Sequence, residues 1–188
     1  CAGIETAGLV CQGYALTGAP PSPTAGNANT EEYDGSSWTS GGALPTATRG
    51  MAAAGTQTLA AAFGGIATAD TNATYEYDGS SWTAGGNLTT GRRYLSGCGT
   101  QTASLAFGGY DGSAYRDLTE EYNGSSWTAG GALNTARSGF AGAGIQTSAL
   151  GFGGYRPAKT DETEQYDGSS WTVLPSTLSA PAGFHAGG

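Results

Sequence analysis

The sequence predicts an all-β fold, and three observations support this prediction. The chain of 188 residues contains 34 glycines but only 12% charged residues, and glycine, serine and threonine in such numbers are costly inside helices. One phrase, Tyr-(Asp/Asn)-Gly-Ser-Ser-Trp, occurs four times, and its tryptophans are 44 or 45 residues apart. Between these copies, short runs of β-type residues end at Asp-Gly or Gly-Gly pairs, which are strong turn signals.

Each period divides at its turn residues into four runs of strand length. In the second period the runs, each with the turn that ends it, are 51–54 (Gly55), 59–63 (Gly64-Gly65), 74–77 (Asp78-Gly79) and 81–83. Periods of roughly 40 to 50 residues made of four short strands are typical of propeller blades. The sequence therefore predicts a β-propeller of four four-stranded blades of about 44 residues each, with the first run of each blade lining the axis.

The two ends of the chain bear on whether the ring closes. We expect one domain over 1–188, with repeat units at about 1–49 together with 180–188, 50–93, 94–138 and 139–179. Phe184 follows Trp171 by thirteen residues, as Phe140 follows Trp127, so 181–188 reads as a first strand. Paired with the N-terminal strands, it would close the ring and remove two open sheet edges. Alternatively, the chain is a fragment of a longer array, or its ends pair with a neighbouring molecule and build a fibre.

The repeat resembles that of the kelch family of β-propellers. Phe63-Gly64-Gly65, Tyr77 and Trp82 follow the kelch order of an apolar run into Gly-Gly, then a tyrosine, then a tryptophan. Arg92 and Arg137 stand where kelch repeats carry an arginine before the first strand. The resemblance covers nearly the whole chain and implies a propeller. The amino-acid sequence of the repeat also resembles repeats in predicted virion and tail-fibre proteins of marine phages, and this resemblance implies an extracellular or virion-surface location.

The composition predicts a core of aromatic side chains, because aliphatic residues are scarce. Small runs such as 52–54 and 141–143 fit the crowded axis, and Cys98 falls in the same position. Cys11 falls in the position of Phe63 and is expected in the core. Arg92 and Arg137 are expected to bond carbonyl groups of the neighbouring blade. Aromatic residues expected between blades are Phe63, Phe107, Phe152, Tyr77, Tyr122 and the four tryptophans.

Catalysis, metal binding and cofactor binding are not expected. His185 is the one histidine, and the three cysteines lack metal-site spacing. Two roles for Cys1 stay open: attachment of a lipid, or a disulfide bond to a partner molecule. The glutamates flanking the third strand of each repeat are expected to keep the outer face soluble. Turn residues expected to cap their own turns, rather than to bind calcium, are Asp34, Asp78, Asn123 and Asp167.

The charge excludes one class of partner, and the loops favour another. With seven basic residues and a net charge of -8, the chain is not expected to bind nucleic acid, and no apolar stretch is long enough for membrane insertion. The loops after the second strand differ among repeats, and variable loops on a rigid scaffold commonly bind ligands; drift is the alternative. Candidate ligand-binding residues on this face are Arg93, Tyr94, Tyr110, Asp111, Tyr115, Arg116, Tyr155 and Arg156.

Tyrosines with polar neighbours suit a carbohydrate or a protein surface, because the ring stacks and the hydroxyl forms hydrogen bonds. We therefore expect a non-enzymatic recognition or adhesion module whose partner is a glycan or a surface protein, on a virion or a cell surface. The alternative is a structural subunit that self-associates into a fibre or decorates a capsid.

Overall fold

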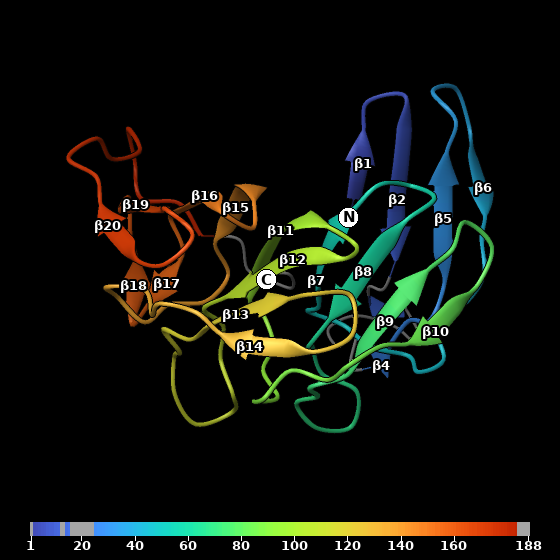
Figure 1. The fold of residues 1–188 in the computed structure, drawn as a ribbon, viewed down its shortest axis with the longest axis horizontal. Helices are drawn as coiled ribbons and strands as arrows, with labels where there is room; N and C mark the ends of the chain where they lie inside the picture. Colours follow the sequence, from blue (N-terminus) through green and yellow to red (C-terminus); the bar gives the residue numbers. More distant parts are fainter. Residues whose placement is uncertain (1, 12–13, 16–24, 184–188) are drawn as a thin grey trace.

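The computed structural model describes residues 2–11, 14–15 and 25–183, and these form β-strands without any helix (Figure 1). The prediction of an all-β fold is confirmed. Most strands belong to four antiparallel four-stranded sheets, called sheets 1 to 4 in chain order. In each sheet the strands lie side by side in the order in which the chain visits them, so each sheet is one repeat.

The strand bounds follow the predicted runs closely. Sheet 1 contains β1 (Ala2–Ile4), β2 (Ala7–Cys11), β5 (Thr30–Tyr33) and β6 (Trp38–Ser40). Sheet 2 contains β7 (Ala52–Gly55), β8 (Ala60–Phe63), β9 (Thr74–Tyr77) and β10 (Trp82–Ala84). Sheet 3 contains β11 (Ser96–Thr100), β12 (Ala103–Phe107), β13 (Thr119–Tyr122) and β14 (Trp127–Ala129). Sheet 4 contains β15 (Ala141–Ile145), β16 (Ser148–Phe152), β19 (Thr163–Tyr166) and β20 (Trp171–Val173). Two small hairpins join β3 (Tyr14–Ala15) to β4 (Ala25–Gly26) and β17 (Tyr155–Arg156) to β18 (Ala158–Lys159).

The repeated Asp-Gly-Ser-Ser segment forms the turn between the third and fourth strands of a sheet. In sheet 2, Asp78 Oδ1 accepts hydrogen bonds from the backbone N–H groups of Ser80 and Ser81 at 2.8 and 2.7 Å. Gly79 has a φ of 90°, which an L side chain rarely adopts. The hydrogen bonds, led by that from the Ser81 N–H, lower the pKa of Asp78 to about 2. The prediction that these residues cap their own turns is confirmed.

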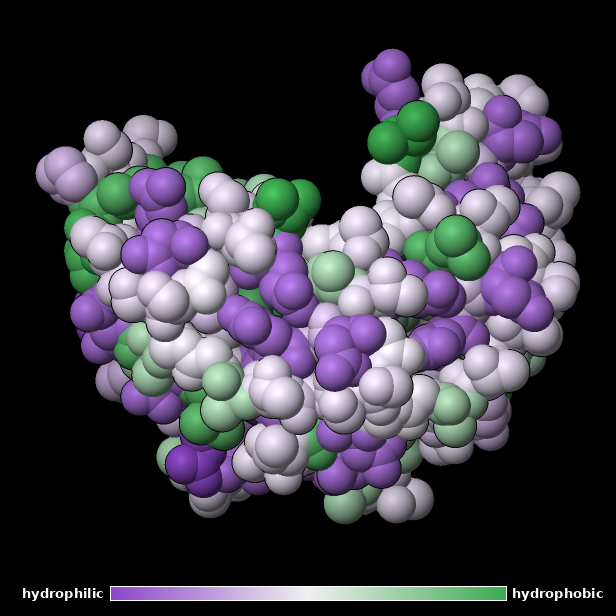
Figure 2. All heavy atoms as spheres, in the orientation of Figure 1, coloured by the Kyte–Doolittle hydropathy of each residue, from purple (hydrophilic) through white to green (hydrophobic). Residues whose placement is uncertain are grey.

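The inner strands arrange the sheets in an open arc. β7 packs between β1 and β11, and β11 packs between β7 and β15. Sheets 1 and 4 stand on opposite sides of a notch that is open in the space-filling view (Figure 2). Sheet 1 already has its own inner strand, β1. The prediction that residues 180–188 supply the inner strand of sheet 1 is therefore wrong for the part of that strand formed by Ala2–Ile4. Closure of the ring depends on residues 184–188, which lie outside the described residues.

The C-terminal register differs by one residue from the expected alignment. The Leu178 N–H donates to Asp161 O at 2.9 Å, just as the Leu133 N–H donates to Asp117 O at 2.8 Å. Ala182 O accepts a hydrogen bond from Gly154 N–H, which is the role of Arg137 O toward Gly109 N–H. Ala182 thus takes the place of Arg137, although it is one residue further from its tryptophan. The extra residue lies between Leu174 and Leu178.

Aromatic side chains fill the spaces between neighbouring sheets, as the sequence predicted. Phe63 lies against β11 at Gly97, where a Cβ atom would be 2.6 Å from the Phe63 ring. Trp127, from sheet 3, packs edge-on against Phe63 with 4.8 Å between ring centroids. Cys11 and Cys98 are buried free thiols, as expected. Predicted core aromatics that are buried are Phe63, Phe107, Tyr77, Tyr122, Trp82, Trp127 and Trp171.

Two predicted core residues are less buried because they face the ends of the arc. Trp38 is 49% exposed, whereas the other three tryptophans are 5–7% exposed. Each of those three packs on the preceding sheet, and sheet 1 has no preceding sheet among the described residues. Phe152 is only partly buried, because none of the described sheets covers that side of sheet 4.

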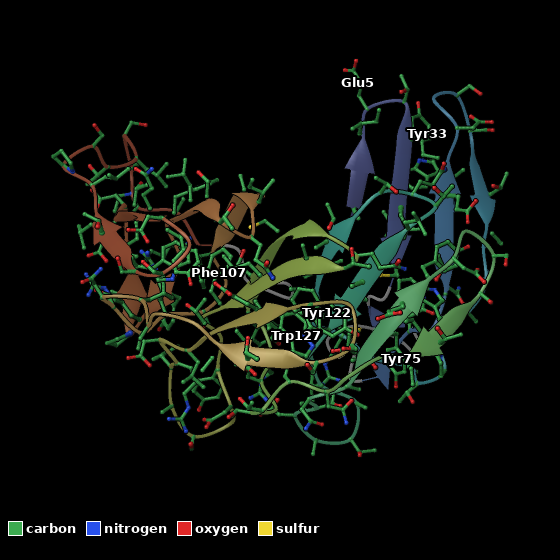
Figure 3. The ribbon with its side chains drawn as sticks, in the orientation of Figure 1. Glu5, Tyr33, Tyr75, Phe107, Tyr122 and Trp127 are labelled. Atoms are coloured by element: carbon green, nitrogen blue, oxygen red, sulfur yellow. The ribbon has the colours of Figure 1, made fainter. Side chains whose placement is uncertain are left out.

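One set of side-chain hydrogen bonds recurs wherever two sheets meet, and we call it the repeat interface. Between sheets 2 and 3, Trp127 Nε1 donates to Thr74 Oγ1 at 2.9 Å, and the Tyr122 hydroxyl donates to Glu76 Oε1 at 2.5 Å. Gln101 Nε2 donates to the Tyr77 carbonyl at 2.7 Å. Figure 3 shows Tyr122 and Trp127 together in the middle of the arc. The same three donors at the other two interfaces are Trp82, Tyr77 and Gln57, and Trp171, Tyr166 and Gln146.

The two arginines before the inner strands are fully buried. Arg92 Nε donates to Gly108 O at 2.9 Å, which confirms the predicted bond to a neighbouring carbonyl. Arg92 also pairs with Glu120 at 2.5 Å, and Arg137 pairs with Glu164 at 2.9 Å. The prediction that these glutamates solubilise an outer face is wrong, since Glu120 and Glu164 are 2% and 0% exposed. A buried charge needs a partner, and the arginine of the preceding repeat provides it.

Candidate functional site

Tyrosines from two repeats converge at one end of sheets 3 and 4. At this end, the loop that follows the second strand of each sheet meets the segment that precedes the first strand of the same sheet. This loop turns back on that segment through single β-bridges, which pair Arg93 with Tyr110 and Ser138 with Tyr155. The bridges place the side chains of both loops around one hollow of about 160 Å³. Its lining residues are Arg93, Tyr94, Tyr110, Tyr115, Ser138 and Tyr155, and we call this hollow the tyrosine pocket.

The aromatic rings of the tyrosine pocket contact one another across the two repeats. Tyr115 lies between the other two loop tyrosines, with its ring centroid 5.3 Å from that of Tyr110 and 5.8 Å from that of Tyr155. Burial, followed by the neighbouring Tyr155 and Tyr110 hydroxyls, raises the pKa of Tyr115. The Tyr115 hydroxyl is therefore protonated at neutral pH and can donate as well as accept a hydrogen bond.

Arg93 gives the pocket one fixed positive charge. Its guanidinium lies 5.1 Å from the Tyr110 ring centroid and 5.8 Å from that of Tyr94. Arg93 Nη1 also donates to Asp70 Oδ1 at 2.7 Å, from the loop of the preceding repeat. The ion pair holds the guanidinium against the rings, so its outer edge is oriented before any ligand arrives.

Tyr94 is the one non-glycine residue with positive φ among the described residues, with φ of 54°. The equivalent positions in the neighbouring repeats are Gly50 and Gly139, with φ of 65° and 60°. The Tyr94 N–H donates to Gly50 O, and Tyr94 O accepts from the Gly139 N–H, both at 2.8 Å. The backbone therefore has the glycine conformation, and a tyrosine adopts it at a cost of about 1–2 kcal/mol. Such strain at a pocket wall is typical of a functional position.

Three of the eight predicted site residues do not line the pocket, because they bind partners within their own loops. Asp111 Oδ1 accepts from the Ser113 and Ala114 N–H groups, and its Oδ2 accepts from Arg116. These hydrogen bonds, that from Ala114 first, hold the pKa of Asp111 well below its usual range. Arg156 pairs with Glu162 at 3.2 Å. The other five, together with Ser138, which the sequence did not single out, form the pocket.

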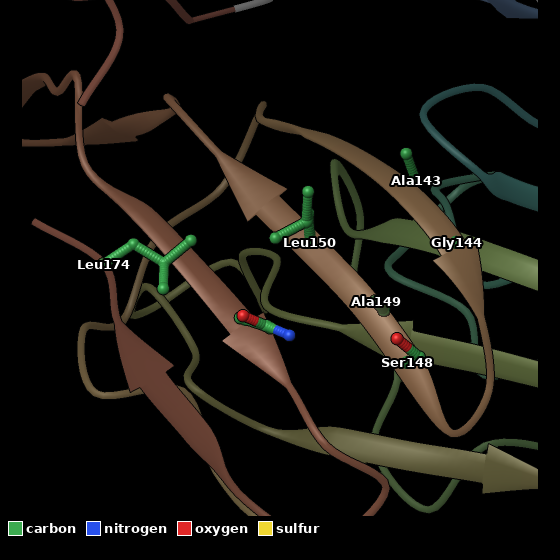
Figure 4. A pocket seen from close by; sticks show the side chains of 7 residues that line it. Ala143, Gly144, Ser148, Ala149, Leu150 and Leu174 are labelled. Carbon is green, nitrogen blue, oxygen red and sulfur yellow. The ribbon is translucent and has the colours of Figure 1, made fainter. Parts of the chain in front are cut away.

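A larger hollow lies on the uncovered side of sheet 4. Its volume is about 470 Å³, and Leu150 and Leu174 border it (Figure 4). The remaining lining residues are Ala143, Gly144, Ser148, Ala149 and Gln165. No ionisable side chain lines it, so it offers apolar surface rather than chemistry. It lies on a side of sheet 4 that no other described sheet covers.

Among the described residues there is no metal-binding cluster, and the Cys98 thiol is not reactive. No group of three or more His, Cys, Asp or Glu side chains that could hold a metal ion lies within 2–11, 14–15 and 25–183. Burial raises the pKa of the Cys98 thiol to about 12, which keeps it protonated and unreactive at neutral pH. Cys1 and His185 lie outside the described residues. The part of the chain that the structure covers has no helix long and apolar enough to span a membrane.

The sequence matches no protein-family model and no curated protein.

Proposed function

We propose that the chain is a non-enzymatic recognition module that binds a glycan through the tyrosine pocket. The observation that carries this proposal is the convergence of Tyr110, Tyr115 and Tyr155, from two different repeats, around one hollow. Pockets for drug-sized ligands are usually about 300–1,000 Å³. A hollow of about 160 Å³ instead suits one ring of a larger ligand, such as one sugar unit, with the rest of the ligand outside.

The chemistry of the lining favours a sugar over a charged small molecule. A pyranose has an apolar face that stacks on an aromatic ring and hydroxyl groups that form hydrogen bonds. Tyr115 and its neighbours offer both rings and hydroxyls, and Arg93 offers N–H donors next to them. Tyrosine-rich surfaces of this kind also bind proteins, which makes a surface protein the second partner class. Action at a virion or cell surface belongs to the same proposal.

Glycan-array binding tests the proposal. Removing the ring of Tyr115 is expected to weaken binding about tenfold, the equivalent of one lost aromatic contact, and Tyr110→Ala and Tyr155→Ala are expected to act in the same direction. Tyr75→Ala is the matched control, since Tyr75 lies on β9 in sheet 2 and does not line the pocket. Binding retained by all three pocket variants would overturn the proposal.

We further propose that the four sheets are blades of a β-propeller. The observations that support this are the recurring interface and the packing of inner strand on inner strand. Closure of the ring, and polymerisation as a structural subunit, both require the uncovered sides of sheets 1 and 4 to recognise each other. Ile4 on sheet 1 and Ile145, Leu150 and Val173 on sheet 4 are exposed apolar residues, but specific pairing of the two sheets also depends on the residues at the repeat interface. Light scattering over a range of concentrations separates a monomer from a polymer.

A further inference from the structure

Each repeat interface joins two chemically different faces. The later sheet presents a glutamine, a tyrosine and a tryptophan, all of which donate hydrogen bonds, and we call this its tyrosine–tryptophan face. The earlier sheet presents a threonine, a glutamate and two consecutive glycines, and we call this its glutamate–glycine face. For sheet 3 on sheet 2 the two sets are Gln101, Tyr122 and Trp127, and Thr74, Glu76, Gly85 and Gly86.

Sheet 1 has an uncovered tyrosine–tryptophan face that is already formed. The rings of Tyr33 and Trp38 lie 5.0 Å apart at 34°, compared with 4.8 Å and 33° for Tyr122 and Trp127 in the covered interface. Trp38 is nevertheless 49% exposed. Its face therefore has the geometry of an interface without the partner, and binding there requires no rearrangement of the pair.

The uncovered side of sheet 4 lacks the glycines that this face requires. Leu174 stands in the place of Gly130, because the N–H of each donates to the equivalent threonine, Thr163 or Thr119, at 2.9 Å. A Cβ atom at Gly130 would be 2.7 Å from the Tyr166 hydroxyl oxygen. In the same arrangement, the leucine of sheet 4 would collide with the hydroxyl of Tyr33.

Pro175 adds a second obstacle next to the first. It follows Leu174 as Gly131 follows Gly130, and a Cβ at Gly131 would be 2.1 Å from the carbonyl oxygen of Ser169. The equivalent N–H of Gly86 donates to the Tyr122 hydroxyl at 3.2 Å. Proline has no N–H, so this hydrogen bond would be lost as well. The backbone carbonyl cannot move aside cheaply, because it belongs to the turn itself.

One polar residue of sheet 1 differs from its equivalents in the covered interfaces, whichever sheet packs on it. Glu5 lies at the tip of the β1–β2 turn (Figure 3), in the place that Gln146 has in sheet 4. Gln146 Nε2 donates to the carbonyls of Tyr122 and Ser104 at 2.7 and 3.0 Å. An ionised glutamate has no hydrogen to donate, so Glu5 weakens the face of sheet 1 toward any sheet of this repeat type, and Glu5→Gln restores the missing donor.

We propose that the tyrosine–tryptophan face of sheet 1 is a docking surface for a further sheet of this repeat type, one with threonine, glutamate and Gly-Gly at the interface. Sheet 4 of the same chain, or of a second copy, is excluded by Leu174 and Pro175, which replace the two glycines. The four described sheets therefore neither close on one another nor polymerise through the repeat interface. The occupant is identified by the three copies of its binding mode that the chain already contains.

Acrylamide quenching of tryptophan emission tests whether the tyrosine–tryptophan face of sheet 1 is uncovered in the native chain. In the native chain we expect one of the four tryptophans to be accessible to the quencher, and Trp38→Phe to abolish that accessible component. Accessibility should not change as the protein concentration is raised. A native chain in which Trp38 is protected, at any concentration, would overturn the proposal, because sheet 4 would then be its partner.

A chain extended by one further sheet tests whether a sheet of this repeat type binds the tyrosine–tryptophan face of sheet 1. A copy of residues 96–142, with its own tryptophan replaced by phenylalanine, is joined directly to Ala2, and Glu5→Gln is introduced. This reproduces the junction between sheets 3 and 4, since Ala2 corresponds to Ala143. We expect Trp38 to become as resistant to quenching as the buried tryptophans. The control carries Leu-Pro instead of Gly-Gly in the added copy and should leave Trp38 accessible. Equal accessibility in the two extended chains would contradict the proposal.

Discussion

The Tyr122 hydroxyl of sheet 3 donates a hydrogen bond to Glu76 Oε1 of sheet 2 at 2.5 Å, and this contact is repeated at each of the three junctions between sheets. Tyr122→Phe removes one such bond and leaves the Glu76 carboxylate without it. Hydrogen bonds to charged groups contribute about 1.5–3 kcal/mol, so the free energy of unfolding should fall by about that amount in urea denaturation. Tyr33→Phe is the control, and its expected effect is within about 0.5 kcal/mol.

The three interface tyrosines predict a loss of stability at high pH. Burial first, and then a glutamate partner, raise the pKa of Tyr77, Tyr122 and Tyr166 to about 12 in the folded chain, from 10. Between these values the folded chain binds more protons than the unfolded chain, so stability is complete below pH 10 and falls as the pH rises toward 12. Urea midpoints measured from pH 9 to 12 check this. A midpoint that is constant over this range would contradict the assignment.

The buried Arg137–Glu164 pair predicts a large effect of a single substitution and a smaller effect of a double one. Arg137→Thr leaves Glu164 charged, buried and without its cation, which costs about 3–5 kcal/mol. In sheet 2 and the segment before it, the equivalent positions hold Thr48, which is buried, and Tyr75, and neither carries a charge. Adding Glu164→Tyr to Arg137→Thr should therefore restore part of the lost stability. If the double variant is less stable than the single one, the two positions do not form a pair.

The glycine pair of the repeat interface predicts that Leu-Pro disrupts an existing junction. In a variant with Gly130→Leu and Gly131→Pro, the Tyr166 hydroxyl loses its place against sheet 3. Trp171 should then become accessible to acrylamide, while Trp82 and Trp127 stay protected at junctions that do not include these glycines. Gly8, where an added Cβ would meet no atom closer than 3.6 Å, offers a control substitution to alanine that should leave all three protected.

Tyr94 predicts a separation of stability from binding. Tyr94→Gly removes the strained positive φ, so the free energy of unfolding is not expected to fall and should rise by up to about 1 kcal/mol. Binding to the tyrosine pocket should weaken, because one wall of the pocket is removed. Thermal unfolding and glycan binding of the same variant give both readings. A variant that is less stable and binds normally would show that Tyr94 is a packing residue only.

The sequence predicted the sheets well, because turn residues and aromatic residues recur in a fixed register. The candidate tyrosines from the loops after the second strand, Tyr110, Tyr115 and Tyr155, line the pocket, and their role in ligand binding stays a prediction. It did not predict the buried glutamates, because Glu120 becomes a core residue only through an arginine 28 positions away that belongs to the preceding repeat. Comparison of repeats contained the signal, since Thr48 and Tyr75 replace the arginine and the glutamate together.

Other differences arise at the ends of the arc and within single loops. Trp38 and Phe152 follow the repeat pattern, but within residues 2–11, 14–15 and 25–183 no neighbouring sheet covers them, and the periodic sequence could not indicate this. Asp111 and Arg116 have the residue types of a binding site, yet both are satisfied by partners within five residues. Local hydrogen bonding of this kind depends on the loop conformation and is not visible in composition.

The most direct test of the recognition function is the affinity of the native chain and of Tyr115→Ala for the glycan that binds best on an array. We predict saturable binding by the native chain, about tenfold weaker binding by Tyr115→Ala, and unchanged binding by the Tyr75→Ala control. Binding that is equal in the native chain and in Tyr115→Ala, or no saturable binding to any glycan or surface protein, would contradict the account.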